Sequence, residues 1–598
     1  MTLTAGPDPD PDPDPDPSVR TSTVRKLDFV LLPFLSLLFL VNSLDRSNIG
    51  NAETAHFTRD AGLQPEDLNA AVAWFFVFFV ALQPVGAAAG RKFGMSRWVP
   101  SVMTLWGVCT LLHIWVRRRW QLIMLRVILG VLEAGFYPTA VSYLSLFYTR
   151  FEFGRRLGLF YGSYGVAGAL GGVIAFFVFS HFPPSEDPID ERITPSDQRT
   201  LRPWQILFLV EGCLTIVIAI MGFFWLPRSA GTAWFLSEEE QAYAERRILI
   251  DRAQADCQRQ EAFNSTTLSD EFAEEETLTR ADDEQRRRLL PDDIGTKKHP
   301  QNFSSDAGLS KSELLSIALF LPLMLPILLL NIASAVPNTG FSVFLPLVLS
   351  SLHLSSPTIS NLLTAPPFLL ASVFLYIFSH WSDKSRKRIV PILASLVVIT
   401  LGLVLTVVFS SSPFSSTSLS PTRAVAIYFS LCILLSGSYI PSPLTVTWLA
   451  SNIPNPGKRT IILGINGYGN LAGVLASIIF SPNFQKDSYH IPFLITLGLV
   501  LVSFIGYVVL WIVIRAINNA RAAATPPATS LDIEIDYSGS GRSFGVGGAE
   551  KIPAFAVVGG TWWDSHVRYW IGRRVLGMDE DDARVRRGDE MLTFQYGL

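Results

Sequence analysis

Charged side chains inside apolar runs are the residues of this sequence that are best placed for chemistry. Asn42, Asp45 and Arg46 lie in the first such run, within about 100° of one another on a helix of about 3.6 residues per turn. An ionisable side chain in hydrocarbon costs at least about 2.5 kcal/mol, so those that occur there usually face a protein interior or a wet cavity. For Asp45 and Arg46, a local ion pair and a functional role are equally compatible with the sequence.

A second polar stripe lies in the apolar run of residues 121–147. Arg126, Gly130, Glu133 and Tyr137 are spaced four, three and four residues apart, which places them on one narrow face of a helix. Two interpretations stay open: Arg126 and Glu133 form an internal ion pair that holds helices together, or they act on a ligand. In the second interpretation, a guanidinium group offers a planar fork to a carboxylate, and a buried carboxyl group takes up and releases a proton.

Uncharged polar residues mark a third segment. Asn466 and Asn470 lie one helical turn apart in the run of residues 461–481. Hydrogen bonding between helices and contact with a ligand explain this pair equally well. Glu211, near the start of another apolar run, is expected to have a structural role.

Pro441 and Pro443 interrupt the apolar run of residues 423–448. Proline removes an amide donor and clashes with the preceding helical turn, so the helix must break there. Broken helices beside a cavity suit a moving gate better than a static anchor.

These residues belong to about twelve long apolar runs. Of the 598 residues, 49% are hydrophobic and 17% are charged, which is too apolar for an ordinary soluble protein of this size. Runs of about 18 or more apolar residues are long enough to cross a bilayer as helices. The predicted spans are residues 27–50, 70–90, 97–116, 121–147, 157–180, 204–226, 320–349, 360–380, 389–410, 423–448, 461–481 and 491–515. We therefore predict an all-α membrane protein.

Polar segments divide the chain into five regions. The predicted regions are a Pro-Asp tail without packed structure (1–26), a bundle of six helices (27–226), a central loop (227–313), a second bundle of six helices (314–515) and a C-terminal tail (516–598). The central loop is expected to begin with a helix over residues 237–252, with a capping box of Ser237 and Glu240. In the tail, residues 562–576 mix aromatic and basic side chains, and either an interfacial helix or a segment packed on the loops is compatible with them.

Basic residues near the ends of the runs predict the orientation. They gather on one side of the predicted membrane: Arg20, Arg25, Lys26, Arg91, Lys92, Arg97, Arg150, Arg155, Arg156, Lys384, Arg386, Lys387, Arg388, Lys458 and Arg459. By the positive-inside rule, both termini and the central loop are then cytoplasmic. Arg117, Arg118 and Arg119 disagree, because the span count places them outside. A missed or extra span near residue 116 would also explain them.

Four longer strings are similar to a known family. They are LDRSNIGNAE (44–53), LRVILGVLEAGFYPTAVSYLSLFYTRFEFGRR (125–156), LLTAPPFLLA (362–371) and TWLASNIPNPGKRTIILGINGYGNLAGV (447–474). The strings resemble the anion:cation symporter family of the major facilitator superfamily. Within that family they look most like the fungal allantoate permease group, which includes nicotinate, pantothenate and biotin permeases.

The resemblance implies a major facilitator fold of two six-helix bundles, a central substrate site and proton coupling. Carried onto matching positions, it implies that substrate or proton binding involves Asp45, Arg46, Arg126, Glu133 and Asn470. We extend this set to Asn42, Tyr137 and Asn466, and expect gating residues at Arg91, Asp383, Arg386, Pro441 and Pro443.

Two positions depart from the patterns of the superfamily. Gly90 stands where the motif after the second span normally carries an acidic residue, although Asp383 keeps that acid in the second half. Ala169 stands where the antiporter signature has proline, which disfavours antiport.

The predicted function is secondary active transport, by proton-coupled symport, of a small organic anion such as a vitamin precursor or a ureide. The sequence shows no nucleophile or metal-ligand spacing, so we expect no enzyme, no cofactor and no metal. The alternative is a nutrient sensor of the same fold that does not transport, suggested by the long central loop and C-terminal tail. We expect a monomer in the plasma membrane, with the anion, a proton and lipid as partners and no nucleic acid.

Overall fold

The computed structural model describes residues 17–184, 201–248, 250, 311–352, 356–385, 387–411, 421–452, 467–485 and 488–524. The elements in these residues are helical. Eleven helices are long and apolar enough to cross a membrane, and a shorter apolar segment covers Gly467–Ile479. These twelve segments coincide with the twelve predicted spans. A helix satisfies its own backbone hydrogen bonds, which is why apolar runs of this length adopt it in a bilayer.

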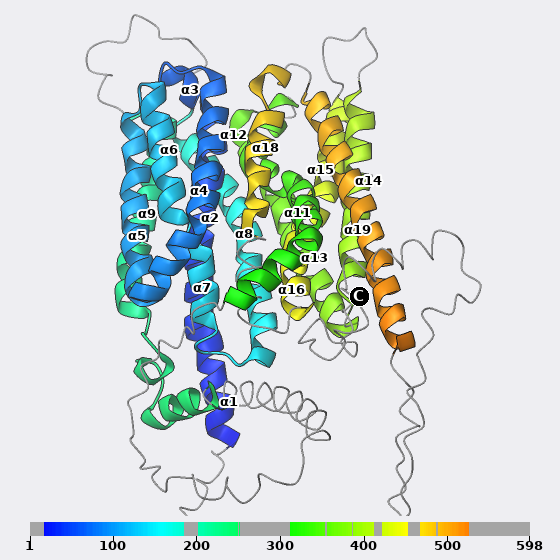
Figure 1. Ribbon diagram of the computed structural model, residues 1–598. Coiled ribbons are helices and arrows are strands. Elements are labelled where there is room, and N and C mark those ends of the chain that lie inside the picture. Colours follow the sequence, from blue (N-terminus) through cyan, green and yellow to red (C-terminus); the bar gives the residue numbers. More distant parts are fainter. Residues whose placement is uncertain are drawn as a thin grey trace, which may run out of the picture.

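The first group of helices stands together on one side of the molecule (Figure 1). Its elements are α1 (Pro17–Lys26), η1 (Leu27–Leu31), α2 (Leu32–Thr54), α3 (Phe57–Asp60), α4 (Pro65–Phe93), α5 (Met95–Leu112), η2 (His113–Trp115), α6 (Arg119–Glu133), α7 (Phe136–Leu144), α8 (Arg150–His181) and α9 (Pro203–Trp225). Pro65 and Pro203 occupy the first turns of α4 and α9, where proline costs no hydrogen bond.

The second group stands beside the first. It consists of α11 (Lys311–Ser351), α12 (Pro357–Leu362), α13 (Ala365–Ser385), α14 (Ile389–Ser410), α15 (Pro421–Ser438), α16 (Pro441–Asn452), η6 (Gly467–Leu471), α18 (Ala472–Ile479), η7 (Pro482–Phe484) and α19 (His490–Ala524). As the prolines predict, the run of residues 423–448 divides into α15 and α16 just before Pro441.

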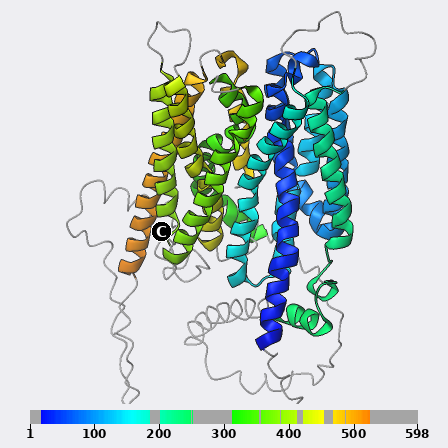
Figure 2. The ribbon, with the colours of Figure 1, turned by 180° about the vertical axis from the view of Figure 1, so that it is seen from behind.

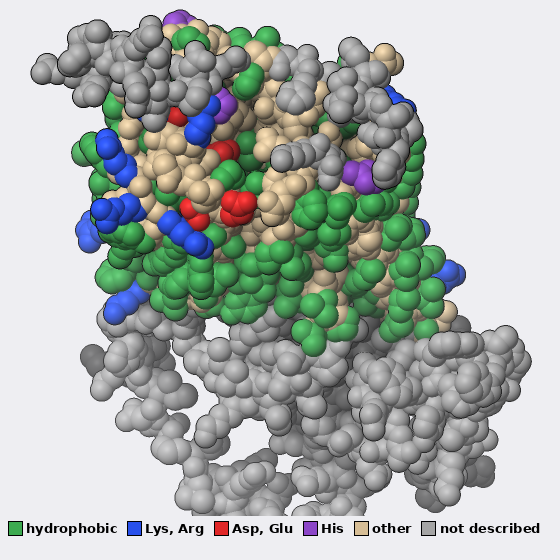
Figure 3. Space-filling view, turned by 90° about the horizontal axis from the view of Figure 1, so that it is seen from above, with side chains coloured by type: hydrophobic (Ala, Val, Ile, Leu, Met, Phe, Trp, Pro, Cys, Tyr) green, Lys and Arg blue, Asp and Glu red, His purple; other side chains and the backbone are tan. Residues whose placement is uncertain are grey.

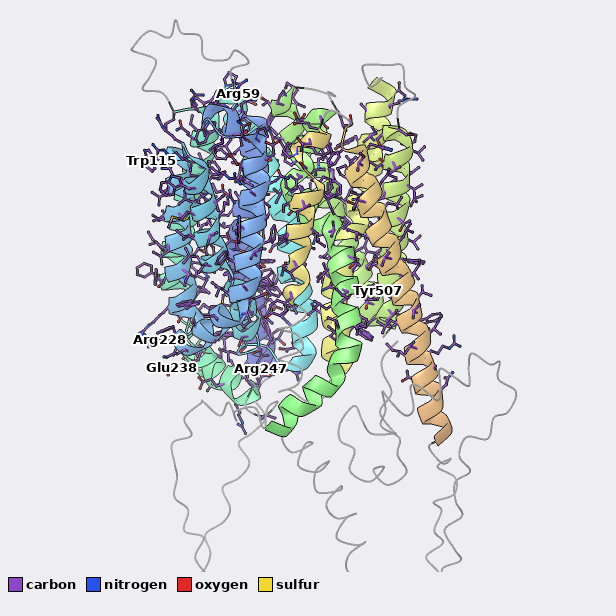
Figure 4. The ribbon with its side chains drawn as sticks, turned by 45° about the horizontal axis from the view of Figure 1, so that its top comes forward. Arg59, Trp115, Arg228, Glu238, Arg247 and Tyr507 are labelled. Carbon is purple, nitrogen blue, oxygen red and sulfur yellow. The ribbon has the colours of Figure 1, made fainter. Side chains whose placement is uncertain are left out.

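The two ends of the bundles differ in what they carry. We call the end with α1, residues 226–248 and the last turns of α19 the proximal end, and the end with α3, α12 and the last turn of α18 the distal end (Figures 1 and 2). Arg228, Glu238 and Arg247 lie at the proximal end, whereas Arg59 and Trp115 lie at the distal end (Figure 4).

The arginines that conflict with the predicted orientation lie at the distal end, between α5 and α6. The described stretch of residues 95–144 has neither a missing nor an extra span. Acidic side chains neutralise this region: Arg119 Nε lies 3.1 Å from Asp67 Oδ1, and Arg202 Nη1 lies 2.8 Å from Asp60 Oδ1. Figure 3 shows acidic and basic side chains gathered over the first bundle on this face.

At the proximal end, the beginning of the central segment binds α1. Residues 238–248 are helical, and Ser237 and Glu240 form the expected capping box. The Glu240 carboxylate accepts hydrogen bonds from Ser22 Oγ (2.6 Å) and Lys26 Nζ (2.7 Å). Burial acts to raise the pKa of Glu240, but the hydrogen bonds from Lys26, Ser22 and the Ser237 amide lower it to about 2.

The distal ends of the two bundles bind each other through amide side chains. Asn69 Nδ2, on α4, donates to the carbonyl oxygens of Ser477 (2.6 Å) and Phe480 (2.8 Å) at the end of α18. Asn361 Nδ2 donates to Thr54 Oγ1 at 2.8 Å. The last carbonyls of a helix have no partner within it, so the Asn69 amide stabilises this contact by satisfying them.

Gly165 and Gly172 of α8 lie close against the second bundle. A Cβ atom at Gly165 would lie 2.2 Å from Ser372 Oγ, and one at Gly172 would lie 2.1 Å from Thr364 Oγ1. At Gly158 and Gly162, nearer the proximal end, a Cβ atom would have no described residue within 4 Å. The two bundles are therefore packed closely along the distal half of α8.

Replacing Glu240 with Gln is expected to loosen the helix of residues 238–248 from α1. The lowered pKa means that ionised Glu240 adds stability at pH values above the ordinary carboxyl pKa of about 4.5, and that this stability is lost as the pH falls towards about 2. Charged hydrogen bonds are worth about 1.5–3 kcal/mol, so hydrogen exchange in this helix should become roughly tenfold faster at neutral pH. The matched control is Glu239→Gln, which alters an exposed residue of the same helix; equal exchange in both variants would contradict the prediction.

Replacing Asn69 with Leu is expected to open the distal contact. Each lost hydrogen bond is worth about 1 kcal/mol, so the ratio of open to closed molecules should rise roughly thirtyfold. Spin labels at the exposed residues Glu66, in the first turn of α4, and Asn483, in η7, should then show a longer distance. Asn69→Asp should act likewise because it removes the donor, whereas Gln485→Leu, at an exposed amide, should not. An unchanged distance in Asn69→Leu would show that other contacts close this end.

Candidate functional site

An ion pair joins α2 to α6 in the interior of the first bundle. Arg46 Nε donates to Glu133 Oε2 at 2.9 Å, and Arg46 Nη2 donates to Asn42 Oδ1 at 3.3 Å. Asn42 and Arg46 can act together because they lie one helical turn apart. The Glu133 side chain is fully buried, whereas that of Arg46 is 10% exposed.

Aromatic rings of α4 enclose the Arg46 guanidinium group. Its Cζ atom lies 4.4 Å from the centre of the Phe79 ring and 5.7 Å from that of Phe75. The negative face of such a ring attracts a cation, most strongly where water is excluded. Arg46 is therefore held by one carboxylate and two rings.

A second group of charged residues lies around Asp45, the neighbour of Arg46 on α2. Arg126 Nη1, on α6, donates to the backbone oxygen of Asp45 at 3.3 Å, and Thr110 Oγ1 donates to Asp45 Oδ1 at 3.3 Å. Glu211, on α9, is buried on the same side and interacts electrostatically with Asp45 and Arg126. Asp45, Arg126 and Glu211 are each only 3% exposed.

The observed pairs differ from both local pairs that the sequence allows. Arg46 contacts Glu133 rather than its neighbour Asp45, and Arg126 contacts the Asp45 backbone while Glu133 binds Arg46. Consecutive residues of a helix point about 100° apart, so Asp45 and Arg46 face different neighbours. The sequence predicted the stripe on α6 but could not predict which helix would supply each partner.

Glu211 is the residue whose place in the site the sequence analysis missed. We expected a structural role, but the structure places Glu211 in the charge cluster. The signal was present, since a lone acid in an apolar span normally faces a protein interior. The cluster thus contains the guanidinium groups of Arg46 and Arg126 and the carboxyl groups of Asp45, Glu133 and Glu211.

An aromatic layer lies about two helical turns along α2 from Arg46. The Tyr137 ring lies 5.9 Å from both Phe39 and Tyr161. Between the bundles, the ring of Tyr164 lies 5.4 Å from that of Tyr439, which occupies the break between α15 and α16. Tyr137 therefore belongs to a layer of rings rather than to the charge cluster.

The second bundle carries amide side chains in η6 and on α11. Asn470 Nδ2 donates to the Gly467 oxygen at 2.9 Å, so it stabilises its own turn in η6 instead of reaching the cluster. A Cβ atom at Gly467 would lie 2.8 Å from Gln83 Oε1, and one at Gly469 would lie 2.6 Å from Asn331 Nδ2. Gln83 is thus a further polar residue at the interface between the bundles, and Asn331 packs against η6 within the second bundle. Asn466 lies outside the described residues.

The expected gating residues that the structure describes lie near the proximal end of α13 and at the start of α16. Asp383 forms an ion pair with Arg388 at the proximal end of α13. Pro441 begins α16, and Pro443 follows in its first turn. Arg386 and the side chain of Arg91 lie outside the described part of the chain.

Known proteins share this architecture. Residues 35–476 match the family model of the Major Facilitator Superfamily. The uncharacterized transporter C1039.04 of Schizosaccharomyces pombe is 29% identical, over 79% of each chain. The major facilitator-type transporter hxnP of Emericella nidulans is 28% identical, over 79% of this chain and 81% of that one. The high-affinity nicotinic acid transporter of Saccharomyces cerevisiae is 24% identical, over 86% of this chain and 82% of that one.

Solved structures agree on the fold. The partially occluded inward-open form of the xylose transporter XylE from E. coli has a TM-score of 0.52 and 12% identity, and covers 79% of this chain and 95% of its own. A bacterial homologue of the human lysosomal transporter Spinster, inward-facing and unoccupied, has a TM-score of 0.52 and 14% identity, and covers 83% and 97%.

At such identities a structural likeness concerns the fold alone. The match of the family model over most of the chain, the named relatives and the twelve apolar helical segments together show that this integral membrane protein belongs to the Major Facilitator Superfamily of transporters.

Proposed function

We propose that the protein is a proton-coupled symporter of a small organic anion, of the kind carried by the fungal allantoate permease group. The observation that carries the proposal is the Arg46–Glu133 ion pair, in which the guanidinium group is 10% exposed and the carboxylate is fully buried. A substrate carboxylate can compete with Glu133 for the same planar donor fork. The site therefore suits an anion of one carboxylate group.

Charge balance links this exchange to a proton. Breaking a buried ion pair by removing one partner costs about 3–5 kcal/mol, because an uncompensated charge stays behind. When a substrate carboxylate replaces Glu133 on Arg46, Glu133 is left without its cation and takes up a proton. When the substrate leaves, Glu133 returns to Arg46 and releases the proton.

The surroundings favour a flat substrate. The rings of Phe39, Tyr137 and Tyr161 offer apolar faces about two turns from Arg46. A heterocyclic carboxylate with its charge on Arg46 would place its ring beside the nearer rings of Phe75 and Phe79, with the aromatic layer beyond it. The name of the yeast nicotinic acid transporter supports this class of substrate.

Movement between the bundles supplies alternating access. Asn69 and Asn361 close the bundles against each other at the distal end. Two spans of the second bundle are interrupted next to the bundle interface: one by the break before Pro441 and the other by the short η6 segment. Basic residues such as Arg25 and Lys26 make the proximal end cytoplasmic by the positive-inside rule. The membrane is the plasma membrane, where a nutrient anion enters the cell.

A nutrient sensor is the alternative function. The binding of residues 238–248 to α1 through Glu240 favours it, because a change in α2 would reach the central segment directly. A sensor would bind the anion without accumulating it.

Uptake of labelled carboxylates separates the two functions. Fungal cells without their own nicotinate permease, expressing this protein, should accumulate nicotinate or another member of a panel of pantothenate, allantoate and dicarboxylates. A protonophore should abolish accumulation against the gradient. Binding without accumulation would favour the sensor, and accumulation that persists in the protonophore would exclude proton coupling.

Replacing Glu133 with Gln should reduce concentrative uptake at least roughly tenfold. Glutamine is neutral, so it cannot pair with Arg46 as an anion when the substrate leaves, and it cannot take up a proton when the substrate binds. The amount of protein in the membrane should stay the same. Glu239→Gln, which changes an exposed acid, serves as the control. Wild-type uptake by the Glu133 variant would remove this residue from the mechanism.

A further inference from the structure

The turn between α5 and α6 carries an exposed group of basic and aromatic side chains. It includes η2, and the sequence from Trp115 to Trp120 is WVRRRW. Trp115 is 66% exposed and Trp120 is 58% exposed, and the three arginines between them are exposed as well. We call these two rings and three arginines the distal Trp-Arg surface. It lies at the distal end of the first bundle, where Trp115 stands at the outer margin (Figure 4).

Hydrogen bonds and packing fix the turn that displays this surface. Gln205 Nε2, on α9, donates to the Ile114 oxygen at 2.8 Å, and the Arg117 amide donates to Gln121 Oε1 at 2.9 Å. The side chains of Ile114 and Val116 are buried. The residues beside them are therefore presented outwards by a turn that is held at both ends.

Apolar stripes lead along both helices to the distal Trp-Arg surface. Their members are 38–56% exposed: Leu105, Val108 and Leu112 on α5, and Met124, Ile128 and Val131 on α6. Spacings of three and four residues place each stripe on one face of its helix. Trp115 follows Leu112 by three residues and Trp120 precedes Met124 by four, so the two rings continue the stripes. Exposed apolar faces of membrane-spanning helices contact lipid tails, so the stripes mark the part of this edge that lies in hydrocarbon.

The arginines carry more positive charge than the described carboxylates around them balance. Arg119 Nε lies 3.1 Å from Asp67 Oδ1, yet the Arg119 side chain is still 66% exposed. Within the described parts of the chain, no carboxylate lies within ion-pair distance of Arg117 or Arg118. The positive-inside rule predicts few basic residues in a short turn at the outer end. Two exposed cations without a described counter-charge therefore indicate an anionic partner.

We propose that the distal Trp-Arg surface binds the phosphate groups of phospholipids in the leaflet at the distal end. Tryptophan gathers at the level of lipid headgroups because its ring is largely apolar while its indole N–H is polar. A guanidinium group offers a planar fork of donors that matches phosphate oxygens. With the stripes in hydrocarbon, the two rings lie at its boundary and the arginines lie just beyond, at the depth of the phosphates.

Lipid bound at this surface anchors three helices of the first bundle. The turn joins α5 to α6, and Gln205 ties it to α9. Because α6 also carries Arg126 and Glu133, the bound lipid fixes the depth of the charge cluster in the bilayer. The inference does not depend on which substrate the protein carries.

Photo-crosslinking of the full-length protein in vesicles tests the proposal. The probe is phosphatidylglycerol with a diazirine in its headgroup, present below saturation in phosphatidylcholine vesicles, and mass spectrometry scores peptides that span residues 112–125. An arginine beside an anionic lipid surface strengthens binding roughly fivefold, so Arg118→Gln should lower labelling of this segment about fivefold, and Arg117→Gln with Arg118→Gln roughly 25-fold. Arg202→Gln removes the same charge from the distal end at an arginine that is paired with Asp60, and should stay within about twofold of wild type.

A probe without phosphate and a soluble anion separate the possible occupants. Galactosyl diacylglycerol with the same diazirine should label wild type and the double variant equally, and glycerol 3-phosphate in solution should not protect the segment. Protection by glycerol 3-phosphate would assign the surface to soluble anions, and loss of labelling at high protein density would assign it to a second copy of the chain. Equal labelling of wild type and both arginine variants by phosphatidylglycerol would refute lipid binding, as would an equal loss in Arg202→Gln. If the double variant does not fold, Arg118→Gln alone decides.

Discussion

Burial of charge in an apolar bundle is the constraint on which the rest of this structure depends. Taking one ion out of water costs several kcal/mol even after relaxation, and this protein buries Asp45, Arg46, Arg126, Glu133 and Glu211 together. The cost is offset by pairing across helices, by cation–π contact with Phe79 and by hydrogen bonds from Thr110. Each compensating contact comes from a different helix, so the cluster and the packing of the bundle determine each other.

The contacts between the bundles are of a different kind. Asn69 and Asn361 use neutral amides, which bind backbone and hydroxyl oxygens for about 1 kcal/mol per hydrogen bond. Such contacts can open during a transport cycle, whereas a buried ion pair must exchange partners. In the proposed transport cycle, the charged interior of the first bundle would bind the ligand, and the amide contacts between the bundles would open and close.

The proximal end connects the charge cluster to the central segment. The first helical stretch continues from α1 through η1 into α2, which carries Asp45 and Arg46, and its beginning is bound by Glu240. Relatives named as transporters share the architecture at 24–29% identity, and solved structures share it at 12–14%. At that distance the fold does not specify a substrate, and only the charge cluster points to an anion.

The sequence alone determined the number of spans, the break before Pro441, the capping box at Ser237 and the shared face of Arg126 and Glu133, because apolar length, proline chemistry and helical period are local properties. Only the tertiary structure decided that Arg46 binds Glu133, that Arg126 binds the Asp45 backbone and that Asn470 turns to its own helix. The burial of Glu211 beside the α2 charges also depends on tertiary structure, since α2 and α9 are far apart in the chain and are brought together by packing. Periodicity gives the face on which a side chain lies, but the helix opposite that face is set by the packing of the whole bundle.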